Sequence, residues 1–227
     1  MYRNICIIPA RGGSKRIPRK NIKDFLGKPI IAYSIEAAKK SGLFSTIVVS
    51  TDDVEIAEIA KMYGAEVPFL RSKENANDYA TLSDVVEEVK NWYLKKSIEY
   101  DFICCLLATA PFVTTLLLKD AFEVLKETEV DSIRPIVKFS YPVQRGYHFN
   151  DSGRVTFLYP EFAKTRSQDL EPVYFDAGLF YWMKFETGFE SDIKGGFIVS
   201  EQVVQDIDTL EDWSYAELKY KILYGVI

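Results

Sequence analysis

The sequence has one histidine, three cysteines and no apolar run of the roughly 20 residues that a membrane-spanning helix needs. Cys6, Cys104 and Cys105 all lie in apolar stretches, and two of them are adjacent. An odd number of buried thiols argues against a disulfide framework and predicts a reducing, cytoplasmic location. Arg3 precedes a strand-like run with no small-residue cleavage site, so we expect neither a signal peptide nor a membrane partner.

An excess of positive charge is also missing, because the formal net charge is −5. The overall field of such a chain does not favour nucleic acid, so we expect no nucleic-acid partner. With 48% hydrophobic residues and no internal repeat or low-complexity linker, the chain predicts one domain over residues 1–227 with a substantial core.

Strand-like and helix-like segments alternate along most of the chain. The expected strands are 4–10, 46–50, 66–69, 102–107, 132–137 and 176–182. The expected helices are 30–40, 52–64 (opened by a capping box of Asp52 and Glu55), 82–93, 115–126 and 209–224. This order predicts a Rossmann-like, three-layer αβα fold with a mostly parallel sheet. Between about residues 139 and 174, aromatics, prolines and turn residues predict a small irregular or hairpin lobe instead.

The segment after the first strand, residues 10–23 (ARGGSKRIPRKNIK), is strongly basic. Its six cations precede the first acid of the chain: Arg11, Lys15, Arg16, Arg19, Lys20 and Lys23. Ligands of open parallel sheets bind beyond the carboxyl ends of the strands, so the position favours an anion site over a merely solvated loop. Gly12 and Gly13 permit backbone geometries that turn amides toward a ligand. Neither the P-loop nor the dinucleotide glycine pattern is present.

Asp206 and Asp208 lie two residues apart near the carboxyl end, in the run QDIDT. On an extended segment both carboxylates point to the same side and repel each other unless a cation lies between them. Magnesium held by one or two carboxylates and by substrate phosphates would meet this need. Alone, the pattern is more typical of a helix start with Thr209 as its cap. Together with the basic loop, it favours a magnesium site at Asp206 and Asp208.

The run IPARGGSKRIPRKN (residues 8–21) resembles the signature of the CMP-sugar synthetases, the cytidylyltransferases for sialic acids and related acidic sugars. The resemblance extends over nearly the whole chain. It implies the nucleotide-diphospho-sugar transferase type of fold, CTP as substrate, Mg²⁺ as cofactor and a homodimer. The residues that it places around CTP are Arg11, Ser14, Lys15, Lys20 and Asn21. Gly12 is expected there too, because glycine can turn its amide toward a ligand. The Asp-x-Asp of the family falls on Asp206 and Asp208, which implies that both bind the metal.

Two further segments match the family around its nucleotide. Arg71 follows a short strand, and Asp78 and Thr81 match an Asp-x-x-Ser/Thr segment. Thr109 is retained from the family's Leu-Gln-Pro-Thr-Ser-Pro run, whereas Leu107 stands where sialic acid enzymes have an active-site glutamine. This departure indicates a different sugar, or the same sugar handled differently.

The stretches ATAPF, YPVQR, RSQDLEP and YFDAGLFYW resemble the branch of the family that acts on pseudaminic acid, a nine-carbon diacetamido keto-acid. Amide and aromatic side chains suit acetamido groups, and an arginine fork suits a carboxylate. The expected sugar-binding residues are Gln144, Arg145, Arg166, Gln168, Tyr174, Asp176 and Phe180. The same lobe equally predicts a dimer interface, because such residues are enriched there, and in related synthetases it extends toward the partner subunit.

These patterns predict the transfer of CMP from CTP to the anomeric hydroxyl of pseudaminic acid, with release of pyrophosphate. Lys20, Arg11 and Asp208 are the expected catalytic residues, and the proton of the hydroxyl passes to an aspartate or to a water beside the metal. The alternatives are synthesis of CMP-N-acetylneuraminate, CMP-legionaminate or, more distantly, CMP-Kdo. A catalytically silent nucleotide-binding module is the alternative outside enzymes.

Overall fold

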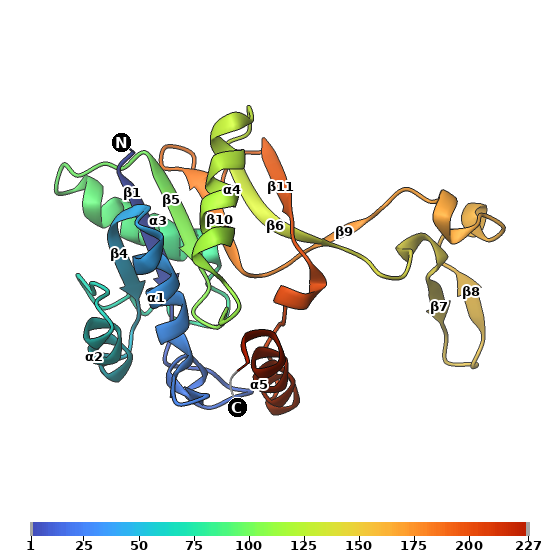
Figure 1. The fold of residues 1–227 in the computed structure, drawn as a ribbon, viewed down its shortest axis with the longest axis horizontal. Helices are drawn as coiled ribbons and strands as arrows, with labels where there is room; N and C mark the ends of the chain where they lie inside the picture. Colours follow the sequence, from blue (N-terminus) through green and yellow to red (C-terminus); the bar gives the residue numbers. More distant parts are fainter. Residues whose placement is uncertain (1, 226–227) are drawn as a thin grey trace.

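A seven-stranded mixed sheet forms the centre of the part of the chain described by this computed structural model, residues 2–225 (Figure 1). The strand order is β11-β6-β10-β5-β1-β4, and β9 pairs with β6. Its strands are β1 (Asn4–Pro9), β4 (Phe44–Ser50), β5 (Phe102–Leu106), β6 (Ser132–Lys138), β9 (Tyr174–Asp176), β10 (Phe180–Lys184) and β11 (Lys194–Ile198). Only β9 and β10 run against the common direction of this sheet, so the expected mostly parallel sheet is confirmed.

Helices cover both faces of this sheet. They are α1 (Ile30–Ser41), α2 (Val54–Met62), α3 (Leu82–Leu94) and α4 (Thr115–Glu127), while α5 (Leu210–Tyr224) packs against the loop after β1 and the start of α1. One hydrophobic cluster joins the sheet to α1, α2 and α4, and a second joins its other face to α3. The three-layer prediction is therefore confirmed. Among residues 2–225, no helix combines the length and apolarity needed to cross a membrane.

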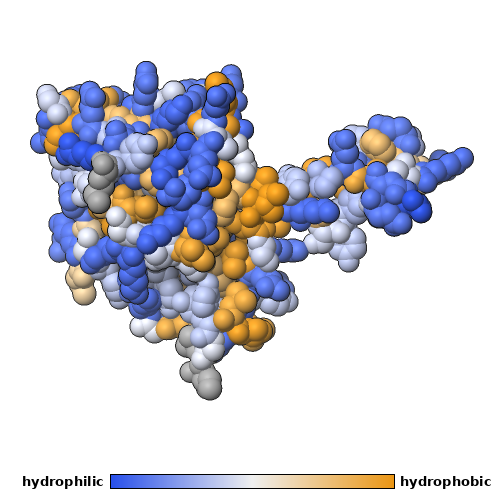
Figure 2. Space-filling view, turned by 45° about the horizontal axis from the view of Figure 1, so that its top comes forward, coloured by the Kyte–Doolittle hydropathy of each residue, from blue (hydrophilic) through white to orange (hydrophobic). Residues whose placement is uncertain are grey.

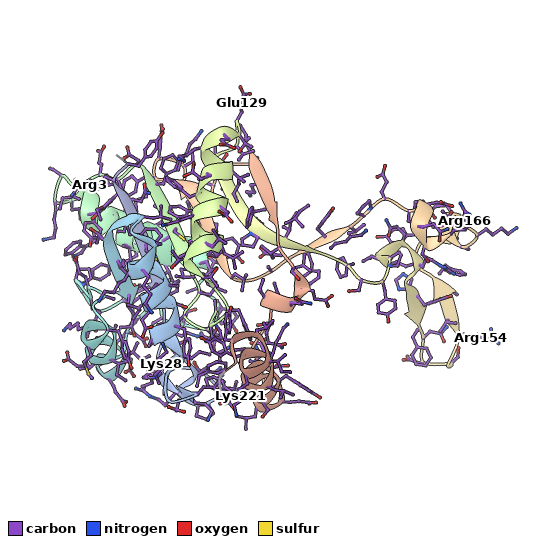
Figure 3. All side chains as sticks on the ribbon, in the orientation of Figure 1. Arg3, Lys28, Glu129, Arg154, Arg166 and Lys221 are labelled. Atoms are coloured by element: carbon purple, nitrogen blue, oxygen red, sulfur yellow. The ribbon has the colours of Figure 1, made fainter. Side chains whose placement is uncertain are left out.

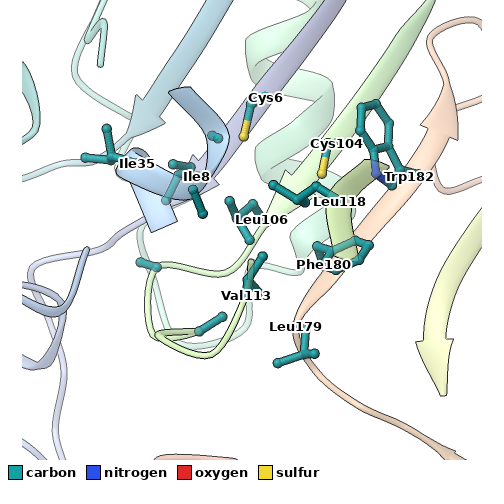
Figure 4. Close-up of a cluster of buried hydrophobic side chains, with 14 of the residues drawn as sticks. Cys6, Ile8, Ile35, Cys104, Leu106, Val113, Leu118, Leu179, Phe180 and Trp182 are labelled. Atoms are coloured by element: carbon teal, nitrogen blue, oxygen red, sulfur yellow. The ribbon is translucent and has the colours of Figure 1, made fainter. Parts of the chain in front are cut away.

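Strand β1 shows why its sequence is a continuous apolar run. Cys6 and Ile8 point into the cluster on the α1 side, whereas Ile5 and Ile7 point into the cluster on the α3 side. Figure 4 shows Cys6 and Ile8 among the side chains of the first cluster. Because both faces of the strand are buried, apolar residues do not alternate with polar ones along it. The same burial holds the strand rigidly at the point where the basic loop begins.

Three local predictions are wrong. Residues 66–69 form no strand, and only Glu66 makes an isolated bridge to Val48. The cap of α2 is Asp53, whose side chain accepts from the Ile56 amide at 3.0 Å, rather than a box of Asp52 and Glu55. Residues 176–182 are not one strand, because the chain turns at Gly178 (φ 60°) between β9 and β10.

An arm, defined here as residues 139–173, projects from the body between β6 and β9 (Figure 1). It holds the hairpin β7 (Tyr147–Phe149) and β8 (Val155–Phe157) and the 3-10 turns η2 (Val143–Arg145), η3 (Pro160–Phe162) and η4 (Ser167–Asp169). None of its residues is buried. The irregular lobe expected at 139–174 is confirmed, and its own packing creates no core.

The amino-terminal loop and the last helix share a third hydrophobic cluster. Ile17, Ile207 and Trp213 are each at most 4% exposed within it. A capping box of Thr209 and Asp212 opens α5, as the sequence suggested. Smaller elements near this cluster are η1 (Lys20–Ile22), β2 (Asp24–Phe25), β3 (Lys28–Pro29) and η5 (Glu201–Val203). The cluster thus brings the loop after β1 against the carboxyl-terminal segment.

Candidate active site

A cleft of about 500 Å³ lies beyond the carboxyl ends of β1 and β5. Three segments line it: the cationic loop (residues 11–23), the loop at 71–81 and the turn at 107–109. Its lining carries five cationic side chains (Arg11, Lys15, Arg16, Lys20 and Arg71) but one carboxylate, Asp78. In a protein of net charge −5, such a concentration of positive charge makes the cleft a candidate anion site.

Nine of the ten residues expected around CTP line this cleft. They are Arg11, Ser14, Lys15, Lys20, Asn21, Arg71, Asp78, Thr81 and Thr109. Gly12 does not, because its amide donates to Asp52 Oδ1 at 2.9 Å, away from the cleft. The expected contact of Gly12 with CTP therefore stays a prediction.

Lys20 joins the cleft to the carboxyl-terminal segment. Its Nζ donates to the carbonyl of Ile207 at 2.7 Å and lies 3.4 Å from Asp208 Oδ1, while Arg16 Nη2 lies 2.8 Å from the same oxygen. Ile207 is buried in the same cluster as Ile17 of the cationic loop, which explains why segments almost 190 residues apart meet here. The structure therefore brings the two segments singled out in the sequence to one place.

The expected metal ligands differ in their surroundings. Asp208 is half-buried against Lys20 and Arg16, whereas Asp206 is exposed and, within residues 2–225, forms no ion pair. Within the same described range, no three histidine, cysteine or acidic side chains group as metal ligands. Two carboxylates are nevertheless the hard oxygen donors that Mg²⁺ uses when substrate phosphates supply the remaining ligands. Neither carboxylate lines the cleft itself, so the chemistry of the two donors suits Mg²⁺ and the metal site stays a prediction.

Asp78 closes one side of the cleft by contacting two cations of the opposite loop. Its carboxylate pairs with Lys15 and, at 3.0 Å, with Arg11 Nη1, which also donates to the Asn77 carbonyl at 2.9 Å. The hydrogen bond from Lys15 and the charge of Arg11 hold the pKa of Asp78 below its ordinary value. The carboxylate thus stays ionised and lies where an anionic ligand would meet the same cations.

Arg71 is 6% exposed yet lines the cleft. Its Nε donates to Ser50 Oγ at 2.9 Å, and its Nη2 donates to the Ser50 carbonyl. Burial lowers the pKa of Arg71 from its ordinary value, although Asp52 and Glu88 oppose this effect. A buried guanidinium held by β4 is a rigid donor for a polar ligand.

Asn21 and Thr81 fix the loops that carry them. Asn21 is 8% exposed, and its Nδ2 donates to the Arg11 carbonyl at 2.9 Å, which links the two ends of the cationic loop. The Thr81 hydroxyl donates to Asp84 Oδ2 at 2.7 Å in the capping box of α3. These residues therefore shape the cleft wall besides lining it.

None of the seven residues expected to bind sugar lines the cleft of its own chain. Four lie on the arm, where Figure 3 shows Arg166 far from the body: Gln144, Arg145, Arg166 and Gln168. Asp176 accepts from the Gly178 amide at 2.9 Å at the root of the arm, near Tyr174 in the same strand. Phe180 is fully buried in the core (Figure 4), so its expected direct contact with sugar is wrong for this conformation.

Sequence reasoning missed two polar residues that line the cleft, Asn75 and Asn77, and counted Arg16 among the loop cations without placing it at CTP. The Asn77 side chain accepts from the amides of Tyr79 (2.7 Å) and Ala80 (3.0 Å), a turn that directs the 71–81 loop back to α3. The closely spaced asparagines in KENAND were the available signal, since asparagine forms such turns.

Known proteins resemble this chain in sequence. The sequence model of the family described as cytidylyltransferase matches residues 5–158. A pseudaminic acid cytidylyltransferase of Campylobacter jejuni is 44% identical over 225 residues, which cover 97% of each chain. A CMP-N,N'-diacetyllegionaminic acid synthase of Legionella pneumophila is 40% identical over 136 residues, 59% of each chain.

A solved structure agrees at the level of the fold. The CMP:2-keto-3-deoxy-manno-octonic acid synthetase complexed with CTP has a TM-score of 0.71 and 18% identity, and covers 99% of this chain and 100% of its own. The fold is therefore of the nucleotide-diphospho-sugar transferase type, as expected. The sequence match to residues 5–158 and the full-length relative lead to the same conclusion: this chain belongs to the cytidylyltransferase family.

Proposed function

We propose that this protein transfers CMP from CTP to the anomeric hydroxyl of pseudaminic acid and releases pyrophosphate. The observation that carries the proposal is the contact of Lys20 with the Ile207–Asp208 segment at the edge of the cationic cleft. This contact places a cation of the cleft beside Asp208, one of the two carboxylates proposed to hold the metal ion. The choice of sugar is supported by the 44% identical, full-length relative named for pseudaminic acid.

The cationic cleft would hold the triphosphate. Lys15, Lys20 and Arg11 would offset the phosphate charges, and Arg71 and Asn21, both held rigidly, would orient the nucleotide. The anomeric hydroxyl of the sugar attacks the α-phosphorus in line. A new P–O bond forms while the bond to the β-phosphate breaks, and pyrophosphate leaves with that electron pair. Such chemistry depends on positioning and charge neutralisation.

The proposal includes Mg²⁺ held by Asp206, Asp208 and the substrate phosphates. When bound, the ion would supply charge neutralisation at the phosphates. Asp208 would also orient Lys20 and Arg16, which share its carboxylate. The proton of the attacking hydroxyl would pass to an aspartate or to water.

A homodimer completes the proposal, because the arm of one chain does not reach the cleft of that chain. The arm exposes large apolar side chains, among them Tyr141 (87%), Phe149 (76%) and Val155 (58%). Figure 2 shows hydrophobic surface where the arm joins the body. In a dimer these surfaces would be covered, and the polar residues of the arm could meet the sugar in the partner's cleft. Three free, buried cysteines support a reducing, cytoplasmic location.

Pyrophosphate release tests the function directly. The full chain is incubated with CTP, Mg²⁺ and, in parallel, pseudaminic, N,N'-diacetyllegionaminic, N-acetylneuraminic or Kdo sugar acid. We expect release to be fastest with pseudaminic acid and to stop when the metal is chelated. Faster turnover of another sugar would replace the proposed substrate. CTP binding without pyrophosphate release from any of the sugars would instead indicate a silent nucleotide-binding module.

A further inference from the structure

Arg19 lies inside the cationic loop but does not line the cleft. Its φ of 56° and ψ of 28° put it in the left-handed region, which a residue with a Cβ rarely occupies. At this turn Lys20 extends toward Ile207, whereas the Arg19 guanidinium extends to α2. Such a backbone conformation persists only where surrounding contacts enforce it.

Two acids at the start of α2 hold the Arg19 guanidinium. Asp53 forms a bidentate pair in which Nη2 donates to Oδ1 at 3.0 Å and Nη1 donates to Oδ2, and Glu55 accepts from Nη2 as well. The planar fork of arginine suits this geometry. The hydrogen bond between the two groups raises the pKa of Arg19 and lowers the pKa of Asp53, so both stay charged near neutral pH.

The same acidic turn also contacts the beginning of the cationic loop. The Gly12 amide donates to Asp52 Oδ1 at 2.9 Å, and a Cβ on Gly12 would lie 2.8 Å from Asp53 Oδ2. The loop is therefore attached at Gly12 to Asp52, just before α2, and at Arg19 to the start of α2 itself. Between these attachments lie Lys15 and Arg16, whose side chains line the cleft.

We propose that Arg19 and Asp53 form a clip that positions the cationic loop for the phosphates of CTP. Arg19 is thus a positioning residue that acts through Lys15, Arg16 and Lys20 and does not touch the nucleotide. The inference rests on the proposed function and identifies what preorganises its phosphate site. Without the clip, CTP must order the loop as it binds, which weakens binding but leaves the bound geometry intact.

Two conservative variants separate the clip from the backbone that carries it. Arg19→Asn removes the guanidinium, and asparagine tolerates the left-handed conformation. Asp53→Asn removes the charge but keeps a good cap for α2. We expect each variant to raise the KM for CTP about fivefold and to change kcat less than about twofold. The double variant should be no worse than the more affected single variant, because both remove one interaction.

Glu58→Gln is the matched control, since it removes an acid from the same helix that pairs only with Lys61 among the described residues. We expect it to leave KM within about twofold of the wild type. Raising the salt from about 0.05 to 0.5 M should shrink the difference between Arg19→Asn and the wild type, because exposed charge pairs are screened. A contact that only stabilises the fold would not produce a rise in KM that shrinks as salt is added.

Hydrogen exchange of residues 11–23 in the ligand-free chain provides a readout that does not need turnover. We expect faster exchange in both clip variants than in the control, and equal protection at saturating CTP. The proposal is overturned if the KM for CTP and the exchange rates of both clip variants match those of Glu58→Gln. A lower melting temperature of the clip variants without these two changes would overturn it as well. A wild type without CTP-dependent pyrophosphate release refutes the proposed function instead, while exchange and CTP titration still decide whether the clip exists.

Discussion

The cleft and the arm differ in what holds their polar side chains. In the cleft, Asn21 and Arg71 are almost fully buried, and each is hydrogen-bonded to a backbone carbonyl. In the arm no residue is buried, and Arg166 pairs only with its near neighbour Asp169 among the described residues. Buried contacts thus hold the polar side chains of the cleft in place, whereas the expected sugar-binding side chains of the arm are held by exposed contacts within the arm.

This contrast assigns the two substrates of the proposed reaction to different parts of the molecule. The nucleotide site depends on contacts within one chain, such as Lys20 with Ile207. In the proposal, the sugar site depends on an assembly of two chains. Substitutions in the cleft should therefore affect turnover whether or not the dimer forms, and substitutions in the arm should act through sugar binding and association.

Replacing Lys20 is the strongest way to test the cleft. Lys20→Met removes a cation from the phosphate site and its bond to Ile207, so we expect kcat/KM to fall on the order of 10²–10³-fold in a pyrophosphate assay. Lys23→Met is the control, because Lys23 lies over the Trp213 ring 5.2 Å away and does not line the cleft. Equal losses in both variants would contradict a specific role for Lys20.

The acid pair should show the next largest effect. Asp206→Asn and Asp208→Asn each replace a charged carboxylate, a proposed Mg²⁺ ligand, by a neutral amide, so we expect turnover to fall on the order of 10²-fold and the required Mg²⁺ concentration to rise. Circular dichroism and melting temperature should show that the fold is retained. Near-normal turnover by Asp206→Asn at low Mg²⁺ would rule out its role as a ligand.

The arm can be tested without touching the cleft. Changing Tyr147 and Phe149 together to serine removes exposed apolar contacts from the hairpin, which are 56% and 76% exposed in the single chain. We expect the mass in solution to fall from dimer to monomer and the KM for sugar to rise about tenfold, with CTP binding unchanged. Met62→Ser, at an 80% exposed position on the body, is the control. A variant that remains dimeric with normal kinetics would show that the hairpin is not the interface.

The same contrast explains how much could be predicted from the sequence. In the body, strands with both faces buried leave continuous apolar runs such as Ile5–Ile8, so β1 and the basic loop after it were identifiable. Strand β11 was missed because Gly195 and Gly196 weaken the apolar pattern of an edge strand. They lie opposite Ile133 and Arg134 of β6, a pairing that local sequence does not encode.

The site itself was only partly predictable. The cations of the loop could be counted, but Arg19 pairs with Asp53, 34 residues away, and no spacing rule indicates which cation turns from the cleft. The sugar residues on the arm were chosen by composition. Composition indicates that the arm could bind a sugar. It does not indicate the second surface that would complete a sugar site, because that surface lies outside the arm.

The smallest expected effect concerns Asp78, whose carboxylate lies between Arg11 and Lys15. Asp78→Asn should tighten CTP binding about two- to threefold at low salt, since the triphosphate no longer competes with a carboxylate for these cations. Because the pKa of Asp78 lies below its ordinary value, the carboxylate is ionised throughout the neutral range, and the effect should be constant from about pH 6 to 8. Isothermal titration checks this, with Glu58→Gln on α2, whose side chain pairs with Lys61 and does not line the cleft, as the control. Weaker CTP binding by Asp78→Asn would mean that the carboxylate helps to hold the nucleotide and does not compete with it.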